Sequence, residues 1–399
     1  MRIALVSAAD QLGGSEAVLL QLIAEVRRLR PAWELHLVVP GGGPLGERAA
    51  SLGARRHIVP MPPSIARIGE WSARGRILSL VTPVVSALGD LRAYQRRFAS
   101  AVDAIQPEIL QTNGFKAHVI AARLRTRAVR IWHIHDYVSR RPMTRRLLRR
   151  YGAVPHAIVA NSMSVGTDVT SVVGERLRRP VRVIYNGVDV DRFCPDGPVA
   201  DLDAASGLPP APEGTVRVGL VATFARWKGH ETFLRALTQV PSNVPVRGYV
   251  IGGPLYDTAG SQWSLDDLRA LAPEVGAESR VGFTGFQPEP AAFLRALDIV
   301  VHASTEPEPF GLVIAEAMAT GKSVITSGTG GAGELIEPEA TAVVHAPGDH
   351  HSLALAIERL ARDAALRARL GGQARVAVAS RFDAARFGEA FVTLYESMR

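Results

Sequence analysis

Cysteines, long hydrophobic runs and nucleic-acid-binding motifs are scarce or missing in this 399-residue sequence. The single cysteine, Cys194, excludes an internal disulfide bond and a cysteine zinc cluster, as is typical of a reducing compartment. No uncharged run approaches the ~20 residues that a membrane-spanning helix needs; the longest candidate, 77–89, contains Pro83. The apolar start, ended by Asp10, is too short for a signal peptide and predicts a buried strand. We therefore expect a cytoplasmic protein that is not integral to a membrane.

Acidic residues are outnumbered, with 38 Asp and Glu against 46 Lys and Arg, which gives a net charge of +8. The excess is concentrated in residues 123–150, which contain ten arginines and one acidic residue, Asp136. This charge favours an anionic partner, but no DNA- or RNA-binding motif is present and no aromatic residues alternate with the basic ones. We therefore expect no nucleic-acid partner, and we favour an anionic lipid surface or an anionic acceptor.

The basic segment includes an expected helix at residues 142–151 with two different faces. Its apolar face contains Met143, Leu147, Leu148 and Tyr151. Its cationic face contains Arg145, Arg146, Arg149 and Arg150. Such a helix is typical of proteins that lie at the surface of an anionic membrane, although an ordinary surface helix would pack its apolar face onto its own domain. The sequence leaves both interpretations open, and the first predicts a peripheral protein at the inner face of the cytoplasmic membrane.

The length predicts two domains, and strands alternate with helices in both halves. The expected strands are 2–8, 34–39, 56–60, 107–112, 129–136, 216–222, 246–252 and 280–285. A long helical segment over 71–105 is expected to break near Pro83, and residues 190–214, rich in Pro, Gly and Asp, are interpreted as a linker. This alternation predicts an α/β protein of two Rossmann-like domains that face a cleft.

Residues 302–334 hold the main candidate site. Glu308 precedes a proline, which favours an extended loop. The composition from Gly311 to Ala319 favours a helix, so Glu316 should lie one to two turns inside it. The backbone N–H groups at the start of that helix would suit a diphosphate; they belong to Phe310, Gly311 and Leu312. The two carboxylates could then accept hydrogen bonds from sugar and ribose hydroxyls.

Two further loops could bind an anion or a sugar. Gly13 and Gly14 separate the first strand from a helix, which indicates either an anion or sugar site or a plain tight turn. They do not match G-x-G-x-x-G, so a nicotinamide-type site is disfavoured. Arg226 and Lys228 lie in a strand-to-helix loop and suit a diphosphate.

The string EPFGLVIAEAMA followed by SGTGGAGELI resembles the donor-binding signature of the retaining glycosyltransferases of family 4, which have the GT-B fold. In that signature two glutamates are separated by seven residues, and Phe-Gly follows the first. The segments LGGSE at 12–16, Asn-Gly-Val-Asp at 186–189 and Lys-Gly-His at 228–230 are also similar to family elements, so the resemblance spans nearly the whole chain.

The resemblance implies a domain division and a reaction. Residues 1–190 would form an acceptor domain and 191–383 a nucleotide-sugar donor domain, with the terminal helix at 384–399 returning to the first. The enzyme would move a sugar from a nucleoside diphosphate to a hydroxyl, in the synthesis of bacterial cell-surface polysaccharide, glycolipid or a glycosylated metabolite. UDP is the commonest such nucleotide and is favoured over GDP and ADP, and the acceptor could be lipid-linked or anionic. No metal or other cofactor is expected.

The resemblance also assigns roles to residues. The expected catalytic residues are His135, Arg226, Lys228 and Glu308. The expected donor-binding residues are Gly13, Gly14, Phe310, Gly311, Leu312, Glu316, Gly330, Gly331 and Glu334. His135 is favoured over His133 because catalytic groups lie at the carboxyl ends of strands.

One position departs from the family pattern, and two other activities remain open. Thr223 stands where the family has an arginine, and we expect Arg226 to supply the missing guanidinium. The alternatives are a non-catalytic nucleotide-sugar or lipid-binding subunit, and a nucleotide-sugar epimerase, whose acid–base residues are not recognisable here.

Overall fold

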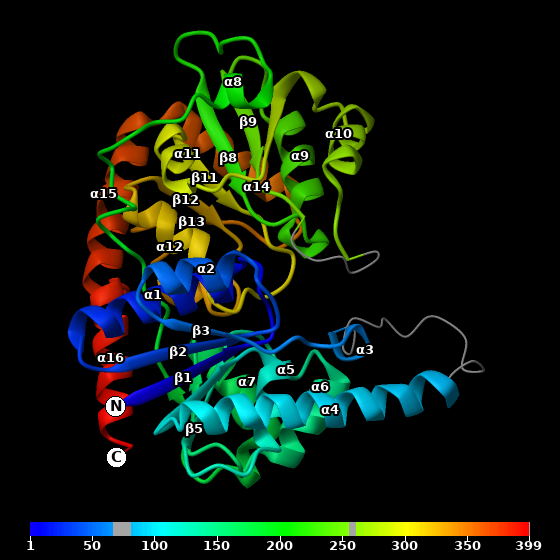
Figure 1. The fold of residues 1–399 in the computed structure, drawn as a ribbon. Helices are drawn as coiled ribbons and strands as arrows, with labels where there is room; N and C mark the ends of the chain where they lie inside the picture. Colours follow the sequence, from blue (N-terminus) through cyan, green and yellow to red (C-terminus); the bar gives the residue numbers. More distant parts are fainter. Residues whose placement is uncertain (67–80, 255–260, 399) are drawn as a thin grey trace. The chain divides into compact units, whose positions relative to one another are not determined.

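The computed structural model describes residues 1–66, 81–254 and 261–398, which form two compact units (Figure 1). Unit 1 comprises Met1–Gly187 with Ala385–Arg399, and unit 2 comprises Val188–Ala384. The boundaries expected from the sequence, at 190 and 384, lie close to these divisions. Within the described ranges, no helix is both long enough and apolar enough to cross a membrane.

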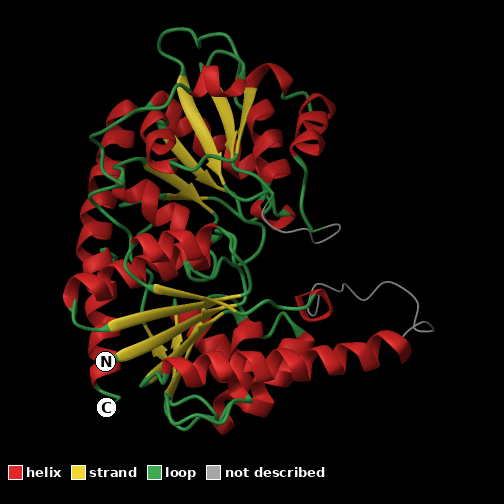
Figure 2. Ribbon diagram, in the orientation of Figure 1, coloured by secondary structure: helices red, strands yellow, loops and turns green. Residues whose placement is uncertain are grey.

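Unit 1 contains a parallel sheet with the strand order β3-β2-β1-β4-β5-β6-β7 among its described residues. The strands are β1 (Arg2–Ser7), β2 (Glu34–Val39), β3 (Arg55–Ile58), β4 (Ile109–Asn113), β5 (Val129–Ile134), β6 (Ala157–Ala160) and β7 (Arg182–Val183). The helices are α1 (Gly14–Leu29), α2 (Pro44–Ser51), α3 (Pro63–Ala66), α4 (Val81–Ile105), α5 (Phe115–Ala122), α6 (Pro142–Tyr151), α7 (Met163–Val173), η2 (Gly174–Arg176) and α16 (Ala384–Glu396). They cover both faces of the sheet (Figure 2).

The last helix, α16, is part of unit 1 although it lies at the other end of the sequence. Its side chains Phe387 and Phe391 pack against His133 of β5, with ring centroids 6.4 and 4.9 Å away. The Tyr395 hydroxyl donates a 2.6 Å hydrogen bond to the buried Gln111 side chain of β4. Burying this aromatic stripe explains why residues so distant in sequence fold with the first half of the chain.

The long helix of unit 1 differs from its expected form. The first part of the expected segment, 71–80, lies outside the described residues. From Val81 to Ile105 the helix is continuous through Pro83, so its described part contains no break there.

Unit 2 contains a second parallel sheet, with the order β10-β9-β8-β11-β12-β13 among its described residues. The strands are β8 (Val216–Val221), β9 (Val246–Ile251), β10 (Val281–Gly285), β11 (Ile299–His302), β12 (Ser323–Thr326) and β13 (Val343–Val344). The helices are α8 (Leu202–Ser206), η3 (Arg226–Lys228), α9 (His230–Gln239), α10 (Leu265–Glu274), η4 (Glu278–Arg280), α11 (Pro290–Ala296), α12 (Leu312–Ala319), α13 (Ala332–Leu335), α14 (His350–Arg362) and α15 (Ala364–Arg381). The core consists largely of apolar side chains from the central strands and the helices that cover them.

The expected linker at 190–214 is partly folded onto unit 2. It contains the short helix α8, whose Asp203 is buried and accepts hydrogen bonds from the Tyr249 hydroxyl (2.6 Å) and Arg247 (2.7 Å). Burial alone would raise the pKa of Asp203, but these donors outweigh it and lower the pKa to about 2. The linker interpretation is therefore wrong for α8, which a charged network anchors to the sheet.

Each sheet reverses its strand order at one place, between β1 and β4 in unit 1 and between β8 and β11 in unit 2. In open α/β sheets, ligands bind beyond the carboxyl ends of the strands at such a switch point. In unit 2, the loop with Lys228 follows β8 and the loop with Glu308 follows β11. The topology therefore brings these two candidate residues to one place.

Candidate functional site

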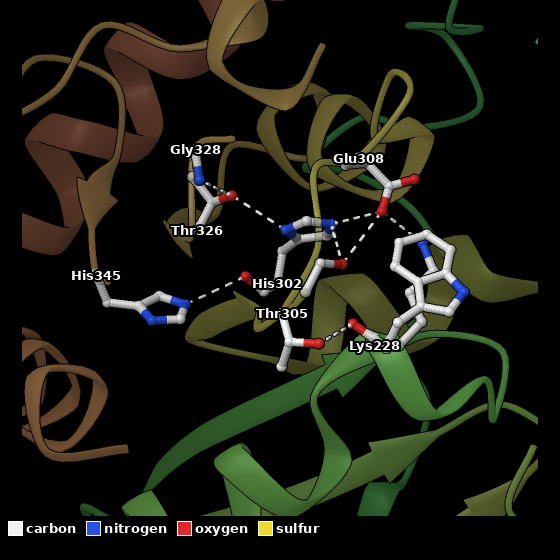
Figure 3. A network of polar contacts seen from close by, with 9 residues as sticks. Lys228, His302, Thr305, Glu308, Thr326, Gly328 and His345 are labelled. Atoms are coloured by element: carbon white, nitrogen blue, oxygen red, sulfur yellow. Dashed lines mark hydrogen bonds and ion pairs between the residues drawn. The ribbon is translucent and has the colours of Figure 1, made fainter. Parts of the chain in front are cut away.

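Lys228 and Glu308 are in direct contact in unit 2 (Figure 3). The Lys228 Nζ lies 2.6 Å from the Glu308 Oε2, and the Glu308 side chain is about one-tenth exposed. The Trp227 carbonyl accepts hydrogen bonds from the Thr305 N–H (2.8 Å) and hydroxyl (3.2 Å), which tie the two loops together. At Gly229, φ is +76° and a Cβ would lie 1.9 Å from the Ala303 carbonyl oxygen, so only glycine allows this approach.

The charge of Glu308 is set by its neighbours. Burial would raise the pKa of its carboxyl group, but the Lys228 ammonium and the His302 ring outweigh it and hold the pKa well below its usual range. Glu308 is therefore an ionised carboxylate at neutral pH. Such a group can only accept hydrogen bonds, which suits the recognition of hydroxyl groups.

A second layer of polar side chains supports Glu308 and comes from neighbouring strand ends. The same oxygen, Oε2, accepts from His302 Nε2 (3.0 Å) and from the Ser304 hydroxyl (3.2 Å). The other ring nitrogen of His302, Nδ1, lies 3.1 Å from the Thr326 Oγ1. His345, which follows β13, places its Nε2 3.4 Å from the His302 carbonyl oxygen. These supporting residues were not predicted from the sequence, although polar residues at the end of a buried strand indicate such a role.

Helix α12 presents the second glutamate. The helix begins at Leu312 after Gly311, whose φ of +94° favours glycine, and it ends at Ala319, so the expected bounds are correct to within one residue. Phe310 is buried, and its ring meets that of Phe382 edge to face with the ring centroids 6.1 Å apart, so its side chain belongs to the core. Glu316 is half-buried on the helix, and burial raises its pKa to about 8 despite the nearby Arg192.

The glycine-rich loop after β12 is joined to Glu308 by the backbone. The Glu308 N–H donates to the Thr329 carbonyl (3.1 Å), and the Gly331 N–H donates to the Glu308 carbonyl (2.8 Å). Gly330 pairs with Glu308 in a parallel bridge, and Glu334 lies in the first turn of α13. The structure thus brings Glu308, Gly330 and Gly331 together.

Arg226 has a different neighbour from Lys228, although both lie in η3. Its exposed guanidinium carbon lies 3.7 Å from the centre of the Trp263 ring, whereas the Lys228 ammonium lies on Glu308 and 4.1 Å from the Trp227 ring centre. Thr223 lies in the same loop. The two cations expected to serve one diphosphate are therefore directed to separate partners in this structure.

The candidate residues of unit 1 lie beyond β1 and β5. Gly13 is the N-terminal cap of α1 and Gly14 its first residue. His135 follows β5 and is half-buried, with its Nε2 3.5 Å from the Asn113 Oδ1, and burial lowers its pKa to about 4. His133 is completely buried, and neither of its ring nitrogens has a hydrogen-bond partner among the described residues. The half-buried His135 is thus the more accessible of the two.

A metal site is not apparent in the described parts of the chain. Within 1–66, 81–254 and 261–398, no group of three or more His, Cys, Asp or Glu side chains is arranged to hold a metal ion. Glu308 is instead neutralised by Lys228 and hydrogen-bonded by His302 and Ser304.

Comparisons with known proteins agree with this architecture. Residues 12–192 match the model of Glycosyltransferase Family 4, and residues 209–377 match that of Glycosyl transferases group 1. A lipopolysaccharide core biosynthesis mannosyltransferase, LpcC, of Rhizobium leguminosarum bv. viciae is 32% identical over 225 residues, which are 56% of this chain and 62% of LpcC. A D-inositol 3-phosphate glycosyltransferase of Corynebacterium jeikeium is 32% identical over 222 residues, 55% of this chain and 52% of that protein. The matches to these curated relatives thus extend over little more than half of their lengths.

Solved structures resemble the whole chain. HepE of Anabaena in complex with UDP-glucose superposes with a TM-score of 0.81 at 23% identity and covers 100% of both chains. Sucrose-phosphate synthase of Thermosynechococcus elongatus superposes with a TM-score of 0.78 at 22% identity, over 100% of this chain and 99% of that one. At these identities the likeness shows the fold. With the two family matches, it establishes that the chain belongs to the GT-B glycosyltransferases of family 4, group 1.

Proposed function

We propose that this protein is a retaining glycosyltransferase that moves a hexosyl group from a nucleoside diphosphate sugar to a hydroxyl acceptor. The observation that carries the proposal is the contact between Lys228 and the ionised Glu308 at the switch point of unit 2. A cation and a buried carboxylate beside the start of α12 are the groups needed to bind a diphosphate and sugar hydroxyls.

In the proposed reaction, the bond between the sugar C1 and the diphosphate oxygen breaks. A bond from C1 to the acceptor oxygen forms on the same face of the sugar, and the acceptor proton passes to the leaving diphosphate. Lys228, Arg226 and the N–H groups at the start of α12 stabilise the negative charge that develops on the leaving group. Glu308 holds the donor sugar and Glu316 the ribose, and residues 330–334 border the phosphates. For Gly13, Gly14 and His135, the proposed roles are those that the family resemblance implies.

The names of relatives support the choice of substrates. HepE has been crystallised with UDP and with UDP-glucose, so a UDP-sugar is the first donor to test. LpcC is named for lipopolysaccharide core biosynthesis, which supports an acceptor in a cell-surface glycan or glycolipid. We place the reaction in the cytoplasm at the inner face of the membrane, with α6 towards the lipid, and without a metal or other cofactor.

A binding and turnover experiment tests the proposal. Thermal unfolding with UDP, GDP and ADP identifies the base, because a ligand that binds the native state raises the apparent stability. Incubation with the matching nucleotide sugars and acceptor glycans should then release the diphosphate, and NMR should show the donor's anomeric configuration in the product. Activity should persist in EDTA. Binding without turnover would instead indicate a non-catalytic subunit, and interconversion of sugar nucleotides would indicate an epimerase.

A further inference from the structure

We propose that His302 is a positioning residue that keeps Glu308 in place when Lys228 moves from this carboxylate to the donor diphosphate. The inference rests on the proposed function, since it concerns the same site. His302 is the last residue of β11 and lies outside the family signature. The proposed role explains why its ring contacts the Glu308 carboxylate.

Lys228 faces two competing anions in the proposed reaction. In the structure described here, its ammonium group lies 2.6 Å from the Glu308 Oε2. A diphosphate carries more negative charge than a carboxylate, and Lys228 has a single positive charge to share between them. Arg226 lies against Trp263 in this structure. Binding of the donor should therefore draw Lys228 away from Glu308.

A buried carboxylate that loses its cation is unstable unless other donors remain. The oxygen that Lys228 contacts also accepts from His302 Nε2 at 3.0 Å and from the Ser304 hydroxyl at 3.2 Å. All three donors converge on Oε2, so His302 and Ser304 can still donate to this oxygen when Lys228 departs. Held in this way, the carboxylate can accept hydrogen bonds from the hydroxyls of the donor sugar.

The hydrogen positions on His302 follow from the charge of Glu308. An ionised carboxylate can only accept, so His302 must carry a hydrogen on Nε2. The other ring nitrogen, Nδ1, lies 3.1 Å from the Thr326 hydroxyl oxygen, within hydrogen-bond distance. Thr326 in turn accepts from the Gly328 N–H at 3.1 Å. A series of hydrogen bonds thus connects the glycine-rich loop through Thr326 and His302 to Glu308.

The backbone of His302 is held as firmly as its ring. Its carbonyl oxygen accepts from the Ser327 N–H at 3.2 Å, and His345 Nε2 lies 3.4 Å from the same oxygen. His302 itself is buried, and Figure 3 shows its ring between Glu308 and Thr326. The ring therefore has little freedom to follow Lys228, and it can hold the carboxylate at a fixed position relative to the glycine-rich loop.

Three substitutions at position 302 separate positioning from packing. In His302→Gln the amide nitrogen can reach the place of Nε2 and still donate to Glu308. In His302→Asn the shorter amide remains near Thr326 and does not reach Glu308, and His302→Leu removes both contacts at similar volume. His351→Asn is a matched control, since His351 is an exposed histidine of the same unit on α14.

The measurements are the Kd for the nucleoside diphosphate and the kcat and KM for release of that diphosphate from its sugar nucleotide. The probes are UDP, GDP and ADP and their glucose conjugates, with UDP-N-acetylglucosamine, UDP-galactose and GDP-mannose. We expect His302→Asn and His302→Leu to lower kcat about 10- to 100-fold, the range typical for loss of a group that orients a functional residue. The Kd of the nucleotide, which lacks the sugar that Glu308 binds, should stay near the wild-type value, and His302→Gln should recover most of kcat.

The outcomes separate the two proposals. Wild-type protein that binds and turns over none of the probes overturns the proposed function, and the inference with it. A wild type that turns over a probe while His302→Asn and His302→Leu retain its kcat overturns the inference alone. The inference would also be overturned if all three variants, including His302→Gln, lost nucleotide affinity, melting temperature and kcat to the same extent. Such a result would show that His302 has a purely structural role.

Discussion

At the scale of single residues, the two glutamates of the site are in opposite states. Glu308 is paired with Lys228 and ionised, whereas burial raises the pKa of Glu316 to about 8. Glu316 is thus mostly protonated at neutral pH before a ligand binds. Hydroxyl groups that donate to its carboxylate would favour the ionised form and lower this pKa.

Glu316 should therefore make nucleotide binding dependent on pH. Because the pKa is higher in the free protein than in the complex, binding releases a proton below pH 8, and the affinity rises with pH up to that value. The effect is at most about tenfold per pH unit. Isothermal titration with UDP, or with the base identified by thermal unfolding, from pH 6 to 8.5 should show this rise in the wild type.

The variant Glu316→Gln is the control, because it cannot ionise. At pH 8.5 it should bind more weakly than the wild type by about 1.5–3 kcal/mol, the contribution of hydrogen bonds to a charged group. Titration of the nucleotide's own phosphate affects both proteins equally. Parallel pH curves for the two proteins would show that Glu316 does not contact the ribose.

Arg226 should supply the cation that Thr223 cannot. We expect Arg226→Ala to lower kcat at least ~100-fold, the scale for losing one group that stabilises developing charge. The double variant Thr223→Arg with Arg226→Ala should restore activity, because an arginine returns to the loop. Arg269→Ala, at an exposed position of α10, controls for charge. Near-normal turnover of Arg226→Ala would show that Arg226 packs on the Trp263 ring but does not stabilise the leaving diphosphate.

At the scale of elements, α6 uses its two faces differently. Leu148 is completely buried in the core of unit 1, so part of the apolar face packs inward, while Met143 is 61% exposed. All four arginines of the opposite face are exposed. Among the described residues, a carboxylate within 4 Å is found for one of them, Arg149, whose partner is Glu175 at 3.8 Å. Any contact with lipid would therefore be mainly electrostatic.

Replacement of the four α6 arginines by glutamine should abolish co-sedimentation with anionic liposomes at low salt. Each basic residue near an anionic surface contributes about 1 kcal/mol, and salt weakens the attraction. Nucleotide affinity should not change. A variant with glutamine at Arg235, Arg269, Arg359 and Arg362 has the same net charge and should still sediment with liposomes. If the wild-type protein does not co-sediment with anionic liposomes, the membrane interpretation is wrong. The remaining interpretations are then that α6 only packs against unit 1 or that its arginines bind a soluble anionic acceptor.

The repeating elements of both sheets were predictable because they depend on local sequence. The strands expected at 34–39, 216–222 and 246–252 agree with β2, β8 and β9 to within one residue. The errors arose where tertiary contacts override local signals. Residues 190–214 have a loop-like composition, but burial of Asp203 against Arg247 and Tyr249 holds α8 on the sheet.

Part of the candidate site was also predictable from local sequence. Lys228 and Glu308 were both expected to bind the donor, and the structure brings them together because their loops follow β8 and β11, which are adjacent in the sheet. The support of Glu308 by His302 and Thr326 depends on the pairing of β11 with β12, in which His302 lies opposite Thr326. Register between strands is set by packing and turn geometry, and one sequence does not reveal it residue by residue.

At the scale of the whole molecule, the two units have the same topology around different switch points. Both sheets run from an edge strand to the first strand of the unit and then reverse. The candidate residues follow β1 and β5 in unit 1, and β8, β11 and β12 in unit 2. The residues proposed to bind the nucleoside diphosphate, Arg226, Lys228 and Glu316, all belong to unit 2. The aromatic stripe of α16 belongs to unit 1, so stability of unit 1 and nucleotide binding should be separable.

Phe391→Ala tests this separation. Phe391 is completely buried between His133, Phe387 and Tyr395, and its truncation should reduce the free energy of unfolding of unit 1 by about 3–5 kcal/mol. The Kd for the nucleoside diphosphate should remain within about twofold of the wild-type value at temperatures where the protein is folded, because distant sites contribute independently. Calorimetry and isothermal titration measure the two quantities. A loss of nucleotide affinity in the folded variant would show that unit 1 contributes to the nucleotide site, contrary to the assignment of that site to unit 2.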